Sequence, residues 1–175
     1  MLNQFITKIA QKEFSRALKF SEGMPPALPF CNDDKKRLLY IHIPFCPELC
    51  PYCSFHRVRF EEQPARQYFA ALRREIKLYQ EKGYTFRGIY VGGGTPTVLM
   101  DELASLLQDA RQTFPIREIS VETNPDHLTA ENIAALQQAG INRLSVGIQT
   151  FNDDLLKKIG RYEKYGRGEA IAAKL

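Results

Sequence analysis

The feature that most constrains the fold of this chain is an alternation of short apolar segments with longer amphipathic ones. Segments rich in β-branched and other apolar residues, which are predicted to be buried strands, cover 37–43, 86–91, 118–122 and 143–149. Segments with apolar residues at helical spacing follow them and cover 64–82, 101–113, 129–139 and 153–160, and a further helix begins within 166–175. This order, with short connections, is typical of parallel strands joined by crossover helices. The sequence therefore predicts an α/β fold with about four βα units.

The first 36 residues lie outside this alternation. Apolar residues between Leu2 and Leu18 recur at helical spacing, which predicts a short amphipathic helix packed on the domain. Residues 21–36 hold three prolines and few periodic apolar residues, so they are predicted to be a linker. We expect an N-terminal helix and linker over 1–36 and one domain over 37–175.

The composition excludes several other classes of protein. The 175 residues are 44% hydrophobic and 25% charged, as in ordinary soluble domains, which excludes disordered and collagen-like chains. The net charge of +4 is mild and gives no argument for a nucleic-acid partner. No segment approaches the ~18 consecutive apolar residues of a membrane span. The N-terminus also lacks the apolar core of a secretory signal, so we expect a cytoplasmic protein.

Three of the four cysteines lie close together in the predicted loop after the first strand. Cys46, Cys50 and Cys53 have the spacing C-x3-C-x2-C, which favours metal or redox chemistry over disulfides in such a chain. Three thiolates are suited to a [4Fe–4S] cluster with one iron left open for another molecule. A zinc site is the alternative, because His56 would complete a Cys3His set. Cys31 lies apart from the motif and is expected to be an unligated thiol.

Further polar and glycine residues follow the other predicted strands, where ligands bind in parallel α/β folds. Gly92–Gly94 precede Thr95 and Pro96, and glycines there allow a ligand to approach the backbone closely. Glu122 would suit the two hydroxyls of a ribose, and Arg161 would suit a carboxylate. Taken alone, these residues are equally compatible with a tight turn, a solvated acid and an arginine at a helix end.

Four motifs in order carry a resemblance to a known family. They are YIHIPFCPELCPYCSF (40–55), GGGTPT (92–97), VETNPD (121–126) and RLSVGIQTFND (143–153). Together they resemble the radical S-adenosylmethionine (SAM) family, and within it the branch of oxygen-independent coproporphyrinogen III oxidases, which includes haem chaperones. The resemblance runs from about Leu38 to Arg161. It implies an incomplete (β/α)6 radical SAM partial barrel with about four βα units present.

The resemblance also implies two cofactors, a [4Fe–4S] cluster and SAM. The implied cluster ligands are Cys46, Cys50 and Cys53. The positions that match the family's SAM contacts are Tyr40, Tyr52, Gly94, Thr95, Pro96, Glu122, Gln149 and Arg161. Among them, the match implies that Glu122 contacts the ribose and that Arg161 contacts the carboxylate of SAM.

The chemistry implied by the resemblance begins with transfer of one electron from the reduced cluster to the SAM sulfonium. The S–C5′ bond then breaks to give methionine and a 5′-deoxyadenosyl radical, which abstracts a substrate hydrogen, while the protein positions the cofactor and excludes side reactions. The implied partners are a tetrapyrrole substrate or haem and a reducing electron donor of the flavodoxin or ferredoxin kind. No nucleic acid is expected.

Two departures from the family pattern bear on function. Phe55 stands where the oxidases have another cysteine, which brings the chain nearer to the haem chaperones and leaves a non-catalytic haem-binding protein as an alternative. The full barrel of the family would also need two more βα units and a C-terminal domain. We therefore expect this chain to be an N-terminal portion, with an exposed sheet edge at Leu144, Val146 and Ile148 that promotes association.

Overall fold

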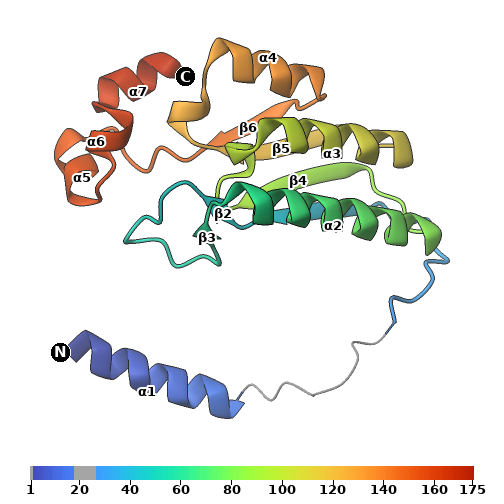
Figure 1. Cartoon of the computed structure of the whole chain (residues 1–175), viewed down its shortest axis with the longest axis horizontal. Coiled ribbons are helices and arrows are strands. Elements are labelled where there is room, and N and C mark those ends of the chain that lie inside the picture. Colours follow the sequence, from blue (N-terminus) through green and yellow to red (C-terminus); the bar gives the residue numbers. More distant parts are fainter. Residues whose placement is uncertain (1, 18–26) are drawn as a thin grey trace.

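The computed structural model describes residues 2–17 and 27–175 (Figure 1). Its main sheet contains β1 (Leu38–Ile43), β4 (Gly88–Gly93), β5 (Glu118–Thr123) and β6 (Arg143–Val146). These strands are all parallel and lie in the order β1-β4-β5-β6. The predicted α/β fold with a four-stranded parallel sheet is therefore confirmed.

Helices connect successive strands and pack on one face of the sheet (Figure 1). They are α2 (Glu62–Glu81), α3 (Met100–Thr113) and α4 (Ala130–Gln138), and α5 (Asp153–Lys158), α6 (Tyr162–Tyr165) and α7 (Gly168–Lys174) follow β6. Short 3₁₀ helices, η1 (Pro96–Val98) and η2 (Pro125–His127), follow β4 and β5. Side-chain oxygens cap two of the helices, since Thr129 accepts from the Asn132 amide and Asn152 accepts from the Leu155 amide.

The core lies between the sheet and these helices, whereas the other face of the sheet is open. In β1 the side chains of Leu39, Ile41 and Ile43 are buried on the helix side, and Leu38 and Tyr40 alternate with them and are exposed. A parallel strand buried on both faces would be apolar throughout. The observed alternation means that one face of the sheet is left for polar and aromatic side chains.

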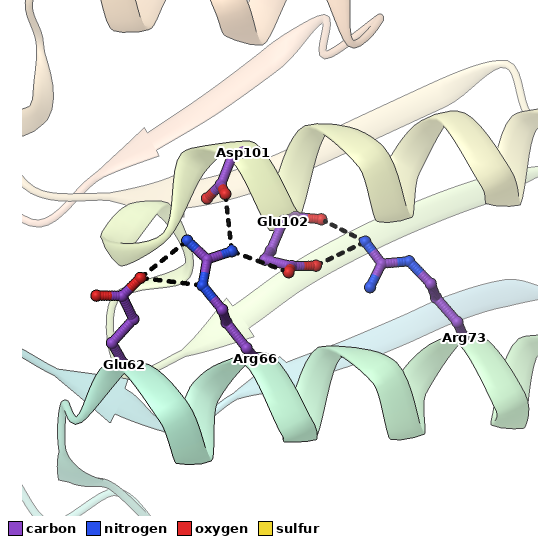
Figure 2. Close-up of polar contacts among 5 residues, drawn as sticks. All are labelled: Glu62, Arg66, Arg73, Asp101 and Glu102. Atoms are coloured by element: carbon purple, nitrogen blue, oxygen red, sulfur yellow. Dashed lines mark hydrogen bonds and ion pairs between the residues drawn. The ribbon is translucent and has the colours of Figure 1, made fainter.

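Five charged residues join α2 to α3 along the outer surface (Figure 2). Glu102 bridges two arginines, with its carboxylate 3.0 Å from Arg66 and 2.7 Å from Arg73. Arg66 also contacts Asp101 at 2.8 Å and Glu62 at 3.0 Å. The hydrogen bond from Arg66 lowers the pKa of the Asp101 carboxyl. In turn, the hydrogen bonds that Arg66 makes to Asp101, Glu62 and Glu102 raise the pKa of its guanidinium group. This network links the exposed sides of the two helices.

Several short elements were not predicted from the sequence. β2 (Phe45–Cys46) pairs in parallel with β3 (Val58–Arg59), inside the segment that was expected to be a loop. Helix α6 lies between the two helices expected over 153–160 and from within 166–175, in a segment where no helix was predicted. The strand predicted over 143–149 ends at Val146, because the chain turns there and Gln149 has a positive φ of 73°.

The N-terminal helix is present, but its predicted packing is wrong for the side chains that can be described. Helix α1 spans Leu2–Ala17, and Ile6, Ile9 and Phe14 are exposed on it. Residues 21–26 of the predicted linker lie outside the described residues, and residues 27–36 form neither helix nor strand, as predicted. None of the described helices is both long and apolar enough to span a membrane.

Candidate functional site

The cysteine loop leaves the sheet at the end of β1 and is closed at its base by the β2–β3 pair. The Val58 amide donates to the Pro44 carbonyl at 2.9 Å, and the Phe60 amide donates to the Cys46 carbonyl at 2.8 Å. These bonds hold the loop over the carboxyl ends of the neighbouring strands. A cavity of about 370 Å³ lies beneath it.

Most of the residues selected from the sequence line this one cavity. They are Cys46, Cys50, Cys53, Tyr52, Gly94, Thr95, Glu122, Gln149 and Arg161. They come from the loop after β1, from the end of β5, and from the segments that follow β4, β6 and α5. The fold therefore brings together residues that are far apart in the sequence, and their roles as ligands and contacts stay predictions.

Two of the selected residues lie elsewhere. Pro96 is fully buried in η1 and does not line the cavity. Tyr40 lies on the open face of the sheet, where its ring stacks on Tyr90 with centroids 6.0 Å apart and its hydroxyl lies 3.0 Å from His42 Nδ1. It borders a groove between β1 and α2 instead.

The three motif cysteines carry free thiols. Cys46 is the most buried of them, and burial raises the pKa of its thiol, while the hydrogen bond from Thr95 acts in the opposite direction. Among residues 2–17 and 27–175, no group of three or more His, Cys, Asp or Glu side chains converges on a point that would hold a single metal ion. A [4Fe–4S] cluster binds each thiolate at a different iron, so its ligands need not converge in this way.

The arrangement fits a cluster better than the alternative Cys3His zinc site, which requires four ligands around one ion. His56 is exposed and does not line the cavity that the three cysteines share. Its backbone carbonyl lies 3.2 Å from His42 Nε2. Cys31 lies apart, and its backbone amide donates to the Lys82 carbonyl at 2.8 Å.

Arg161 is a buried cation in the wall of the cavity, only 4% exposed. It donates to the Tyr52 hydroxyl at 2.8 Å and to the Gly147 carbonyl, and it lies 4.2 Å above the ring of Tyr165. Its Nε is buried without a partner. Because an unpaired buried donor is costly, this pattern is typical of a side chain whose hydrogen bonds are completed by an anionic ligand.

Glu122 points into the same cavity from the end of β5. Its Oε1 accepts from the Tyr90 hydroxyl at 2.6 Å, and its Oε2 accepts from the Gly93 amide at 3.2 Å. The bond to Glu122 is also the main cause of the raised pKa of Tyr90. Each carboxylate oxygen has a second lone pair, so Glu122 is oriented by the protein and still free to accept from a ligand.

Glycine at position 94 allows the end of β4 to approach the cysteine loop. The Gly94 amide donates to the Ile43 carbonyl at 2.7 Å, and the Thr95 amide donates to the Phe45 carbonyl at 2.8 Å. A Cβ at Gly94 would lie 2.7 Å from the Phe45 carbonyl oxygen, closer than real Cβ atoms come. This contact places Thr95 beside Cys46.

The cavity is also lined by residues that the sequence did not single out, among them Arg57, Asn124 and Lys164. Arg57 follows the cysteine motif and donates to the Cys50 carbonyl. Asn124 lies inside the motif VETNPD directly after β5, and this position could have marked it as a candidate site residue. Lys164 lies in α6, which was not predicted, and no sequence signal marked it.

The comparisons with known proteins agree with this geometry. The family model for the radical SAM superfamily matches residues 40–172. The chain belongs to the radical SAM superfamily. Radical SAM proteins generally use a [4Fe–4S] cluster and SAM, which are therefore the cofactors that the family implies.

Within the radical SAM superfamily, the chain is similar to haem chaperones and to oxygen-independent coproporphyrinogen III oxidases. The chain is 45% identical over 132 residues to the haem chaperone HemW of Bacillus subtilis, covering 71% of this chain and 35% of the relative. It is 38% identical over 142 residues to the oxygen-independent coproporphyrinogen III oxidase of Bradyrhizobium diazoefficiens, covering 76% and 31%. The structure of the Escherichia coli coproporphyrinogen III oxidase HemN, a radical SAM enzyme, matches with a TM-score of 0.64 and 33% identity, covering 73% and 31%. The chain thus spans about a third of the length of these relatives.

Proposed function

We propose that residues 37–175 are the cofactor-binding core of a radical SAM protein of tetrapyrrole metabolism, with residues 1–36 as an N-terminal helix and linker. The observation that carries this proposal is that three free cysteines and the buried Arg161 line one cavity at the carboxyl edge of the sheet. In a parallel α/β fold this is the edge at which ligands bind.

Each group in the cavity has a task in this proposal. Cys46, Cys50 and Cys53 would hold a [4Fe–4S] cluster, and Arg161 would pair with the carboxylate of SAM. Glu122 would accept from the ribose hydroxyls. When bound, the two cofactors supply one-electron cleavage of SAM to methionine and a 5′-deoxyadenosyl radical.

The remaining side chains keep these groups in place. Tyr90 and the Gly93 amide orient Glu122. Tyr52 and the Gly147 carbonyl orient Arg161. The Arg57 side chain donates to the Cys50 carbonyl and so links the end of the cysteine loop to its middle. Because these contacts are made within the chain, a ligand meets side chains that are already positioned, which lowers the entropic cost of binding.

Within tetrapyrrole metabolism we favour haem as the molecule that the whole protein handles. The 45% identity to a haem chaperone and Phe55 in place of the oxidases' additional cysteine both support this choice. A coproporphyrinogen-oxidising enzyme is the second candidate, supported by the 38% identical oxidase and by the HemN structure. In either case we propose a cytoplasmic protein that receives electrons from a flavodoxin-like or ferredoxin-like donor.

Anaerobic reconstitution with iron and sulfide, followed by titration with haem, tests the proposal. We expect about four irons per chain, a broad visible absorption of an iron–sulfur protein, and a Soret shift when haem binds. Replacing Cys46, Cys50 or Cys53 with Ala should abolish iron binding, because each substitution leaves only two thiolates.

Cys31→Ala and His56→Ala are the matched controls and should retain iron. A chain that binds zinc and loses it in His56→Ala would contradict the cluster assignment. A whole protein that binds iron as expected but leaves the haem spectrum unchanged would contradict only the choice of haem.

A further inference from the structure

A buried threonine and a half-buried asparagine link the ends of β4 and β5 to the first cysteine of the motif. Thr95 follows β4 and is 2% exposed, and its Oγ1 lies 3.7 Å from Cys46 Sγ. Asn124 follows β5 and donates from Nδ2 to the same Thr95 oxygen at 3.0 Å. We call this set the Asn124–Thr95–Cys46 relay.

The contacts around Thr95 determine which way its hydroxyl donates. A threonine hydroxyl has one hydrogen and two acceptor lone pairs. Because Oγ1 accepts from Asn124, its hydrogen remains available for the sulfur of Cys46. The Thr95 amide also donates to the Phe45 carbonyl at 2.8 Å, so the backbone that carries the hydroxyl is held against the cysteine loop.

Cys46 is the cysteine for which such a donor matters most. It is 7% exposed, while Cys50 and Cys53 are more accessible to solvent. Water therefore has little access to its sulfur, and a hydrogen bond in a buried environment is electrostatically stronger than one in water. Among the described residues, Thr95 is the side chain that donates to this sulfur.

Hydrogen bonds to the thiolate ligands are one of the factors that set the potential of an iron–sulfur cluster. Reduction adds one negative charge to the cluster and its ligands, so a donor at the sulfur stabilises the reduced form more than the oxidised form. Resting on the proposed function, we propose that the Asn124–Thr95–Cys46 relay raises the reduction potential of the cluster. Thr95 is then a positioning and tuning residue that acts through Cys46.

Thr95→Val tests this proposal because it removes the hydroxyl and keeps the shape of the side chain. The cluster potential is measured without SAM, by titration with dithionite and redox mediators followed by electron paramagnetic resonance of the reduced cluster. We expect the ratio of reduced to oxidised cluster at a fixed potential to fall about five-fold, as for loss of a modest hydrogen bond. By the 59 mV per ten-fold of a one-electron couple, this is a shift of about 40 mV to more negative potential.

Three further variants separate tuning from a general effect on the loop. Thr95→Ser keeps the hydroxyl and should keep the wild-type potential. Asn124→Ala should shift the potential in the same direction by less, because the hydroxyl stays but is no longer oriented. Thr97→Val is the matched control, since Thr97 lies two residues further along in η1 and is 3% exposed, and its hydroxyl contacts Thr123 at 2.8 Å and His127 at 2.6 Å.

The outcomes distinguish this inference from the function it rests on. If the wild type binds no cluster, the proposed function is wrong. If the cluster forms and Thr95→Val has the wild-type potential, or if Thr97→Val shifts it equally, the relay has no tuning role. Should Thr95→Val fail to fold, an unchanged potential in Asn124→Ala would overturn the proposal in its place.

Discussion

At the scale of single residues, Glu122 shows how the chain prepares a side chain for a ligand. Both of its carboxylate oxygens already accept a hydrogen bond, from Tyr90 and from the Gly93 amide. These bonds leave a lone pair on each oxygen and restrict the rotamers of the side chain. A ligand hydroxyl that binds here therefore meets an ordered acceptor.

We predict that Glu122→Gln weakens SAM binding by about ten- to hundred-fold, because hydrogen bonds to a charged group contribute roughly 1.5–3 kcal/mol. Calorimetric titration of the reconstituted protein measures this. Glu118→Gln is the matched control, since Glu118 lies on the same strand and face but at the opposite end of β5. Equal affinity of Glu122→Gln and wild type would show that the SAM pocket lies elsewhere.

At the scale of elements, the packing of α2 against α3 is supported by the ion-pair network of Figure 2. Isolated surface pairs contribute little, but networks that share a partly buried partner are the exception. Glu102 is that partner, with a side chain 18% exposed between Arg66 and Arg73. Without the negative charge of Glu102, the repulsion between the guanidinium groups of Arg66 and Arg73 would be less well balanced.

Glu102→Gln is predicted to lower the free energy of unfolding by about 1 kcal/mol, which is roughly 2–4 °C in Tm for a chain of this size. Thermal unfolding followed by circular dichroism measures the change. Glu62→Gln serves as the control, since Glu62 is 64% exposed and contacts only Arg66 in the network, and it should lower the Tm much less. An equal fall in Tm in the two variants would show that the position of Glu102 between two arginines adds no stability.

At the scale of the whole molecule, the sheet has an edge at β6, which pairs only with β5 among the described residues. Arg143 and Ser145 are exposed, while Leu144 and Val146 are half-buried on the helix side. The edge is therefore less apolar than the sequence suggested, but its outward backbone groups are available to another strand. Unpaired edges of this kind promote association between chains.

We predict that the 175-residue chain self-associates through β6 as its concentration rises. Sedimentation velocity over a ten-fold concentration range measures the association. Amide hydrogen exchange should then show growing protection at 143–146 and unchanged protection in the central strand β4. A monodisperse monomer, or new protection at β1 in place of β6, would contradict this prediction.

The sequence by itself determined the order of the elements and most of the site. Periodicity is a local property, so the alternation of strand and helix segments could be recognised without any contact between them. The motif spacing likewise identified the cysteines, Glu122 and Arg161, because each lies at the end of a predicted strand or helix. Parallel strands bring their carboxyl ends to one edge, and this rule, together with the family resemblance, predicted that these residues would lie at one site.

Only the tertiary structure decided the features that depend on contacts between distant segments. The β2–β3 pair forms because the loop returns to its own base, and no local pattern marks two-residue strands. Tyr40 lies outside the cavity because its register on an edge strand places it beside Tyr90. The Asn124–Thr95–Cys46 relay joins three segments, and its hydrogen bonds exist only once the strands that carry them are side by side.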